Sequence, residues 1–151
     1  MSNRIQECPN LKDMTDLIHV GLGFNSISHL IDASQWLPAT LVSLDLSWNH
    51  FYDLKGTLDH LSTAQSLRNL VLLGNPIRMA SVYHQTVLSR LPELYSLDEE
   101  KIEKEAKAIA KDANIDWTQL FVTLTWNVCG LTGVAKPEST VGTVPDQPQD
   151  E

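Results

Sequence analysis

The most reactive side chains of this chain, its histidines and cysteines, have spacings that predict no catalytic or metal site. The two cysteines, Cys8 and Cys129, form no CxxC pair, which favours two free thiols in a reducing compartment. Asp59 and His60 are adjacent, but adjacency alone does not orient an acid–base pair. Since glycine-rich phosphate loops and GxSxG elbows are also absent, we predict a protein that is not an enzyme and needs no metal or cofactor. Neither HxxxH nor HExxH spacing relates the five histidines, His19, His29, His50, His60 and His84.

The charge of the chain limits the partners that it can bind. A net charge of −8 and an isoelectric point near 5.0 over 151 residues argue against nucleic-acid and anionic-membrane surfaces, which need clustered lysine and arginine. The N-terminus lacks the apolar core of a signal peptide, and no apolar run approaches the length of a membrane span. We therefore expect a cytoplasmic protein that binds neither nucleic acid directly nor membranes.

Three copies of the pattern L-x-x-L-x-L-x-x-N run through the middle of the chain, and their asparagines lie 24 and 26 residues apart. This period falls in the range of leucine-rich repeats. Residues two apart in a short strand point to one side, so Leu44 and Leu46 should face inward and Asp45 outward. Stacked repeats then bury the inward residues in one continuous core. The copies are Leu17–Val20–Leu22–Asn25, Leu41–Leu44–Leu46–Asn49 and Leu67–Leu70–Leu72–Asn75.

An asparagine ends each copy, and its amide suits a structural role. Where the chain turns out of a strand, buried peptide groups need hydrogen-bond partners, and an inward amide offers two donors and one acceptor. We therefore predict that Asn25, Asn49 and Asn75 form a ladder of structural hydrogen bonds along the repeats.

After the third asparagine the pattern changes to GNPI at 74–77, Tyr83, and then VLxxLPxLxxLD at 87–98. This part resembles the C-terminal LxxLD-type cap of leucine-rich repeat proteins. The same cap is seen in the leucine-rich regulatory subunit of protein phosphatase 1, a ciliary dynein light chain, other axonemal leucine-rich proteins and a leucine-rich spliceosomal subunit. His84 stands where such caps often carry arginine. The resemblance covers residues 17–98 and implies a fold, but this fold serves many functions.

The pattern therefore predicts an α/β fold, a short solenoid of about three leucine-rich repeats with parallel strands and a C-terminal cap. Asp98 is placed to cap a following helix over 98–113. Beyond it, alternating apolar residues predict a strand over 119–129. The proposed boundaries are 1–16 (lead-in or partial cap), 17–98 (repeats and cap), 98–118 (helix and connection), 119–134 (strand segment) and 135–151 (disordered acidic tail).

Both ends of this arrangement need further contacts. A solenoid requires a cover at its N-terminal end, and Ile5, Cys8, Leu11 and Met14 could supply one. A lone strand is unstable without a neighbour, so 119–129 must join the repeat sheet, pair with another chain or begin a further β-domain. We therefore favour a piece or short isoform of a longer protein over a self-sufficient molecule.

Outward positions of the parallel strands should form a concave binding surface. An apolar, aromatic-bearing strip with few charges suits a helix or strand of a protein partner, and Trp and Tyr commonly anchor such contacts. Packing of Trp48 on a neighbouring turn, or an Asp45–Arg68 ion pair, would be the structural alternatives. The candidate partner-binding residues are His19, Phe24, Asp45, Trp48, Arg68, Val71, Leu73 and Tyr95.

We therefore expect a non-catalytic scaffold or adaptor within a larger assembly, with the ciliary axoneme as the setting that the resemblance favours. One alternative is a regulatory subunit of an enzyme such as a protein phosphatase, although that class typically has many regular repeats. Another is a protein-binding subunit of a ribonucleoprotein.

Overall fold

The strands of the computed structural model, which describes residues 3–112, form one five-stranded sheet in sequence order. The strands are β1 (His19–Gly21), β2 (Ser43–Asp45), β3 (Asn69–Val71), β4 (Ser96–Leu97) and β5 (Glu100–Lys101). Strands β1 to β4 are parallel, and β5 returns antiparallel beside β4. Helices α1 (Ala33–Trp36), α2 (Leu54–Leu61) and α3 (Tyr83–Arg90), with a 3-10 turn η1 (Pro76–Met79), connect the strands, and α4 (Lys104–Asp112) follows the sheet. The predicted α/β repeat solenoid is confirmed.

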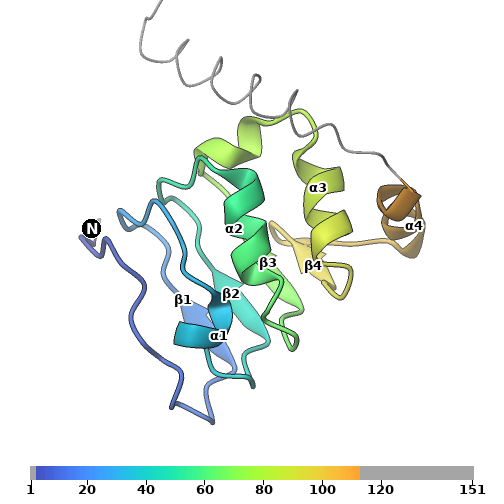
Figure 1. Ribbon diagram of the computed structural model, residues 1–151. Coiled ribbons are helices and arrows are strands. Elements are labelled where there is room, and N and C mark those ends of the chain that lie inside the picture. The colour runs from blue at the N-terminus through green and yellow to red at the C-terminus, as the bar shows by residue number, and fades with distance from the viewer. Residues whose placement is uncertain (1–2, 113–151) are drawn as a thin grey trace, which may run out of the picture.

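The register of the sheet follows the leucine pattern. Val20, Leu44, Leu70 and Leu97 lie side by side on neighbouring strands. All four are buried, because the helices α1 to α3 lie against the same face of the sheet (Figure 1). Stacking therefore gives each inward residue apolar neighbours from the adjacent repeats.

Helix α2 shows how the sequence builds the helical layer. Its apolar residues Leu54, Leu58 and Leu61 recur at helical spacing and are fully buried. Asp53 caps the helix, since its carboxylate accepts a hydrogen bond from the Gly56 N–H at 2.9 Å. The sequence thus fixes both the start of the helix and the face that it turns toward the sheet.

The predicted asparagine ladder connects successive repeats. The Asn49 amide nitrogen donates to the carbonyls of Leu22, Leu46 and Ser47 at 2.9–3.1 Å. Its oxygen accepts from the Ile27 N–H at 3.0 Å. Asn75 repeats this arrangement toward Phe51 and Leu46. Each amide therefore satisfies buried peptide groups of its own repeat and of the preceding one.

The N-terminal segment continues the ladder. Asn25 accepts from the Ile5 N–H at 3.1 Å, and the Ser26 N–H donates to the Ile5 carbonyl at 2.9 Å. These bonds match those that Ile27 makes with Asn49 and His50 in the next repeat. Ile5 thus makes the contacts of the apolar residue that follows a ladder asparagine, and Asn3 stands two positions before it, as in the repeats.

The expected N-terminal cover forms in part. Cys8 and Leu11 pack against the core, and the Leu11 N–H donates to the Trp36 carbonyl at 2.7 Å. Ile5 and Met14, in contrast, are exposed. The cover therefore depends on two of the four predicted residues and on backbone hydrogen bonds.

Asp98 has a different role from the predicted helix cap. It is buried, and its carboxylate accepts hydrogen bonds from the Leu72 N–H at 2.7 Å and from Arg78 Nε and the Tyr83 hydroxyl at 2.9 Å each. The prediction was wrong because these long-range donors compete successfully with the nearby helix. The guanidinium at this site comes from Arg78, while His84 is exposed.

The helix after the sheet also begins later than predicted. Asp98 and Glu99 have φ values of 51° and 70°, outside the right-handed helical region. Residues 100–101 then form β5, and α4 begins at Lys104. The predicted strand 119–129 and the tail 135–151 lie outside the described residues.

Replacing Asn49 with Ala should lower the free energy of unfolding by about 1–3 kcal/mol, because it leaves buried peptide groups without partners. Urea denaturation measures this change. Asn69→Ala is the control, since the Asn69 side chain lies half-buried and accepts one hydrogen bond from Ser96. Equal effects of the two substitutions would contradict the ladder.

Tyr83→Phe should destabilise the chain by about 1.5–3 kcal/mol at neutral pH, because it removes a buried hydrogen bond to a carboxylate. Burial and the neighbouring Asp98 raise the pKa of the Tyr83 phenol above its ordinary value of 10.0. This contribution is therefore present below pH 10 and is lost as the pH rises through and above it. The stability advantage of the parent chain over Tyr83→Phe should shrink in alkaline urea titrations; a constant advantage would contradict the assignment.

Candidate protein-binding surface

The concave face is the side of the sheet opposite to α1, α2 and α3, and the predicted binding residues lie along it. His19, Asp45 and Val71 alternate with the buried apolar residues of β1, β2 and β3. Leu73 and Arg68 follow and precede β3, and both are half-buried. Phe24 and Trp48 lie beyond the ends of β1 and β2, and Tyr95 directly precedes β4.

Two predicted aromatic residues form a stacked pair at the edge where the strands end. The rings of Phe24 and Trp48 have centroids 5.8 Å apart and planes 14° apart. Both side chains remain more than half exposed, at 55% and 56%. They occupy equivalent positions, each directly before a ladder asparagine. Both aromatic residues have a left-handed backbone there, with φ values of 56° and 53°. A left-handed backbone is strained for a bulky residue, and such strained residues are concentrated at functional sites.

Gly74 occupies the equivalent position in the third repeat, and its φ is 73°. A Cβ atom at this position would overlap the indole ring of Trp48, so the ring lies directly over the glycine. The structural alternative for Trp48, packing on a neighbouring turn, is therefore present together with exposure. The equivalent positions Phe24, Trp48 and Gly74, two of which carry aromatic side chains, are called the aromatic row below.

Small and paired polar side chains fill the centre of the face. His19 Nδ1 lies 2.9 Å from Ser43 Oγ, and Ser96 Oγ donates to Asn69 Oδ1 at 2.8 Å. Gly21 leaves open space, since a Cβ there would have no atom within 4 Å. The centre of the concave face therefore carries short side chains, and its polar groups largely bond to each other.

The alternative ion pair between Asp45 and Arg68 does not form in the described structure. Arg68 donates to the carbonyls of Gln65 and Leu67 at 2.8 and 2.9 Å. Asp45 Oδ1 instead accepts from the Ser47 N–H at 2.8 Å. The two charges are thus held apart by separate backbone contacts.

A second row, where the strands begin, contains two apolar residues that the sequence prediction missed. Ile18, Val42, Arg68 and Tyr95 are joined in succession by backbone hydrogen bonds, from Val42 N to Ile18 O, Arg68 N to Val42 O and Tyr95 N to Arg68 O. Ile18 is 64% exposed, and Lys101 Nζ lies 5.5 Å from the centroid of the Tyr95 ring. Their shared second position in the repeat was the signal available in the sequence. We call these four residues the strand-entry row.

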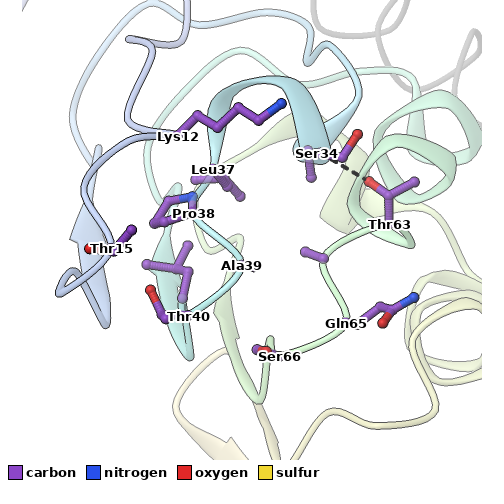
Figure 2. A pocket seen from close by; sticks show the side chains of 13 residues that line it. Lys12, Thr15, Ser34, Leu37, Pro38, Ala39, Thr40, Thr63, Gln65 and Ser66 are labelled. Carbon is purple, nitrogen blue, oxygen red and sulfur yellow. Dashed lines mark hydrogen bonds between the residues drawn. The ribbon is translucent and has the colours of Figure 1, made fainter.

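A separate pocket of about 370 Å³ lies between the N-terminal segment, α1 and the turn before β3 (Figure 2). Proline, alanine, threonine and serine side chains dominate its lining, and Lys12 supplies its charge. On one side the Ser34 N–H donates to Thr63 Oγ1 at 3.3 Å. None of the predicted binding residues lines it.

The described residues contain no arrangement suited to metal binding, since none of their His, Cys, Asp and Glu side chains gather in groups of three or more. Burial raises the pKa of the Cys8 thiol to about 12, which disfavours the reactive thiolate at neutral pH. Between residues 3 and 112, no helix has the length and apolar character needed to cross a membrane.

The repeat pattern, parallel sheet and asparagine ladder together define a leucine-rich repeat protein. Comparisons with known proteins agree. The chain is 31% identical over 144 residues to human leucine-rich repeat-containing protein 43, and 34% identical over 108 residues to human leucine-rich repeat-containing protein 23. It is 32% identical over 109 residues to U2 small nuclear ribonucleoprotein A' of Eremothecium gossypii.

These alignments cover most of this chain but a minor part of each relative. They include 87%, 72% and 72% of this chain, and 22%, 31% and 45% of the three relatives in the same order. A chain of the crystal structure of the Drosophila melanogaster SNF/U2A' complex superposes with a TM-score of 0.69 at 22% identity. The match covers 80% of this chain and 68% of that chain and shows the shared fold. No protein-family model matches the sequence.

Gly74→Ala should destabilise the chain by more than the roughly 1–2 kcal/mol that a left-handed alanine costs, because the new Cβ displaces the Trp48 ring. When Trp48 is already replaced by Ala, Gly74→Ala should cost only the free energy of the left-handed alanine backbone. Urea denaturation of the four variants gives the coupling energy. A coupling of zero would show that the ring does not lie over Gly74 in solution.

Proposed function

We propose that this chain is a non-catalytic protein-binding module, a scaffold or adaptor that holds a helix or strand of a partner on its concave face. The exposed aromatic row is the observation that carries the proposal. Stacked Phe24 and Trp48, with Tyr95 at the other row, provide the large rigid side chains that dominate binding energy at protein interfaces. The unit that binds is residues 17–98.

The shape of the face supports a partner segment lying between the two rows. Gly21 and Gly23 and the serines at 43 and 47 keep its centre low, while the aromatic row and the strand-entry row stand on either side. About six residues of strand separate Ile18 from Phe24, or roughly 20 Å. This width exceeds the 10–12 Å diameter of an α-helix, so a helix or strand has room between the rows.

We further propose that the C-terminal closure is of the LxxLD type. The Asp98 carboxylate, with bonds to Leu72, Arg78 and Tyr83, supports this assignment because it uses the final residue of that motif. The setting that this subtype favours is a cytoplasmic assembly such as the ciliary axoneme. In ciliated cells, a tagged full chain should then be enriched along the axoneme; uniform cytoplasmic signal would contradict that setting.

The similarity to U2 small nuclear ribonucleoprotein A' favours one second candidate, a protein-binding subunit of a ribonucleoprotein. Such a subunit can be acidic when it contacts a protein and leaves the RNA to that partner. Co-purification with RNA that RNase treatment removes would support this candidate over the axonemal one.

Tyr95→Ala should weaken partner binding by more than about 1 kcal/mol, roughly fivefold, while folding is retained. Tyr52→Ala is the matched control, because Tyr52 is 59% exposed, close to the 57% of Tyr95, but precedes α2 off the concave face. Quantitative mass spectrometry of proteins co-purified with each variant measures the loss. Partners that both variants retain equally would contradict binding by the concave face.

A further inference from the structure

The concave face is open over Gly21, the β1 residue that pairs with Asp45, because a Cβ there would have no atom within 4 Å. This open space is called the hollow below. Gly21 and Gly23 are the outward residues between His19 and Phe24, so no side chain covers the concave face between these two residues. A Cβ at Gly23 would lie 2.8 Å from Ser47 Oγ and 3.4 Å from Asp45 Oδ2. The Ser47 hydroxyl therefore already fills the space over Gly23, and Asp45 Oδ2 lies beside it.

Asp45 has one carboxylate oxygen available at this hollow. Oδ1 accepts from the Ser47 N–H at 2.8 Å, which fixes the orientation of the side chain. Oδ2 has no hydrogen-bond or ion-pair partner among residues 3–112. Arg68 is engaged by two carbonyls, so it does not neutralise this charge. A partner that covered the hollow with apolar groups alone would bury a carboxylate without compensation, which is costly.

The aromatic row begins at Phe24, three residues beyond Gly21. Phe24 follows Gly23 directly, and its ring stacks on Trp48. A cation is attracted to exposed aromatic rings, and the planar guanidinium of arginine both stacks on such rings and pairs with carboxylates. The same group thus matches both the Asp45 carboxylate and these rings.

We infer that the hollow over Gly21 takes a cationic side chain of the partner, preferably arginine, which pairs with Asp45 Oδ2 and extends toward the exposed rings of Phe24 and Trp48. This inference rests on the proposed function and specifies the chemistry of the segment that binds. The partner segment is then apolar along the two rows and carries a basic residue where it crosses β1 and β2. An acidic residue at that point is disfavoured, because it would meet the Asp45 carboxylate.

The probe for this inference is a displayed library of random twelve-residue peptides selected on the full chain. Selected peptides should contain arginine, and fluorescence anisotropy should show at least tenfold weaker binding to Asp45→Asn. Asparagine can still accept from Ser47 N, so folding is retained, as thermal melting checks. Asp13→Asn, an exposed residue of the N-terminal segment, is the matched control and should change affinity less than twofold. Replacing the peptide arginine with citrulline should cause the same loss, and the two losses should not add.

The outcomes separate the inference from the proposed function. Peptides that Tyr95→Ala weakens but Asp45→Asn does not, or that lack basic residues, overturn the inference and leave concave-face binding intact. A library that yields no peptide weakened by Tyr95→Ala overturns both. Equal losses with Asp45→Asn and Asp13→Asn would show a general charge effect and also overturn the inference.

Discussion

The hydrogen bonds of the asparagine ladder are the constraint on which the other features depend. Each amide holds the chain where it leaves a strand, and the residue before each amide has a left-handed backbone, Phe24, Trp48 and Gly74 in turn. Left-handed conformation costs of order 1–3 kcal/mol for a non-glycine residue unless the surroundings fix it. The ladder supplies that fixation, and the same turns place the two aromatic rings on the concave edge.

The two ends of the sheet use the same logic with different groups. At the N-terminal end, the Asn25 side chain accepts a hydrogen bond from the Ile5 N–H, where the later asparagines accept one from the preceding repeat. At the C-terminal end, a carboxylate replaces the amide, and Asp98 needs Arg78 and Tyr83 to accompany its buried charge. The repeats and their register could be predicted because Leu44 and its equivalents obey a local period. The role of Asp98 could not be predicted, since its donors lie 15 to 26 residues away in the sequence. Local signals instead predicted that Asp98 caps the following helix.

The candidate surface was predictable to a similar degree and for similar reasons. Strand alternation places His19, Asp45 and Val71 on the outward side, where the structure has them. The stacking of Phe24 on Trp48 depends on left-handed backbones that no residue type announces, since bulky side chains seldom adopt them. Ile18 was missed because the outward set was started one position later in the first two repeats, whereas Arg68 and Tyr95 at the equivalent position were included. Sequence patterns therefore predict which positions face outward on the sheet more readily than the contacts between their side chains.

Those contacts bear on what the surface can bind. His19 with Ser43, and Ser96 with Asn69, already make hydrogen bonds within the face, and Arg68 is bonded to its own backbone. A partner can cover the His19–Ser43 and Ser96–Asn69 pairs at low cost, because their bonds persist when water leaves. The Arg68 guanidinium keeps further N–H donors that need acceptors, since its bonds to the Gln65 and Leu67 carbonyls use Nη1 alone. The apolar rows then contribute by burial, at roughly 25 cal/mol for each Å² removed from water. The Asp45 carboxylate also needs a partner group, since one of its oxygens lacks a donor after water is excluded. Under the proposed function, affinity for an apolar segment and selectivity for a basic residue therefore arise from different residues of the same surface.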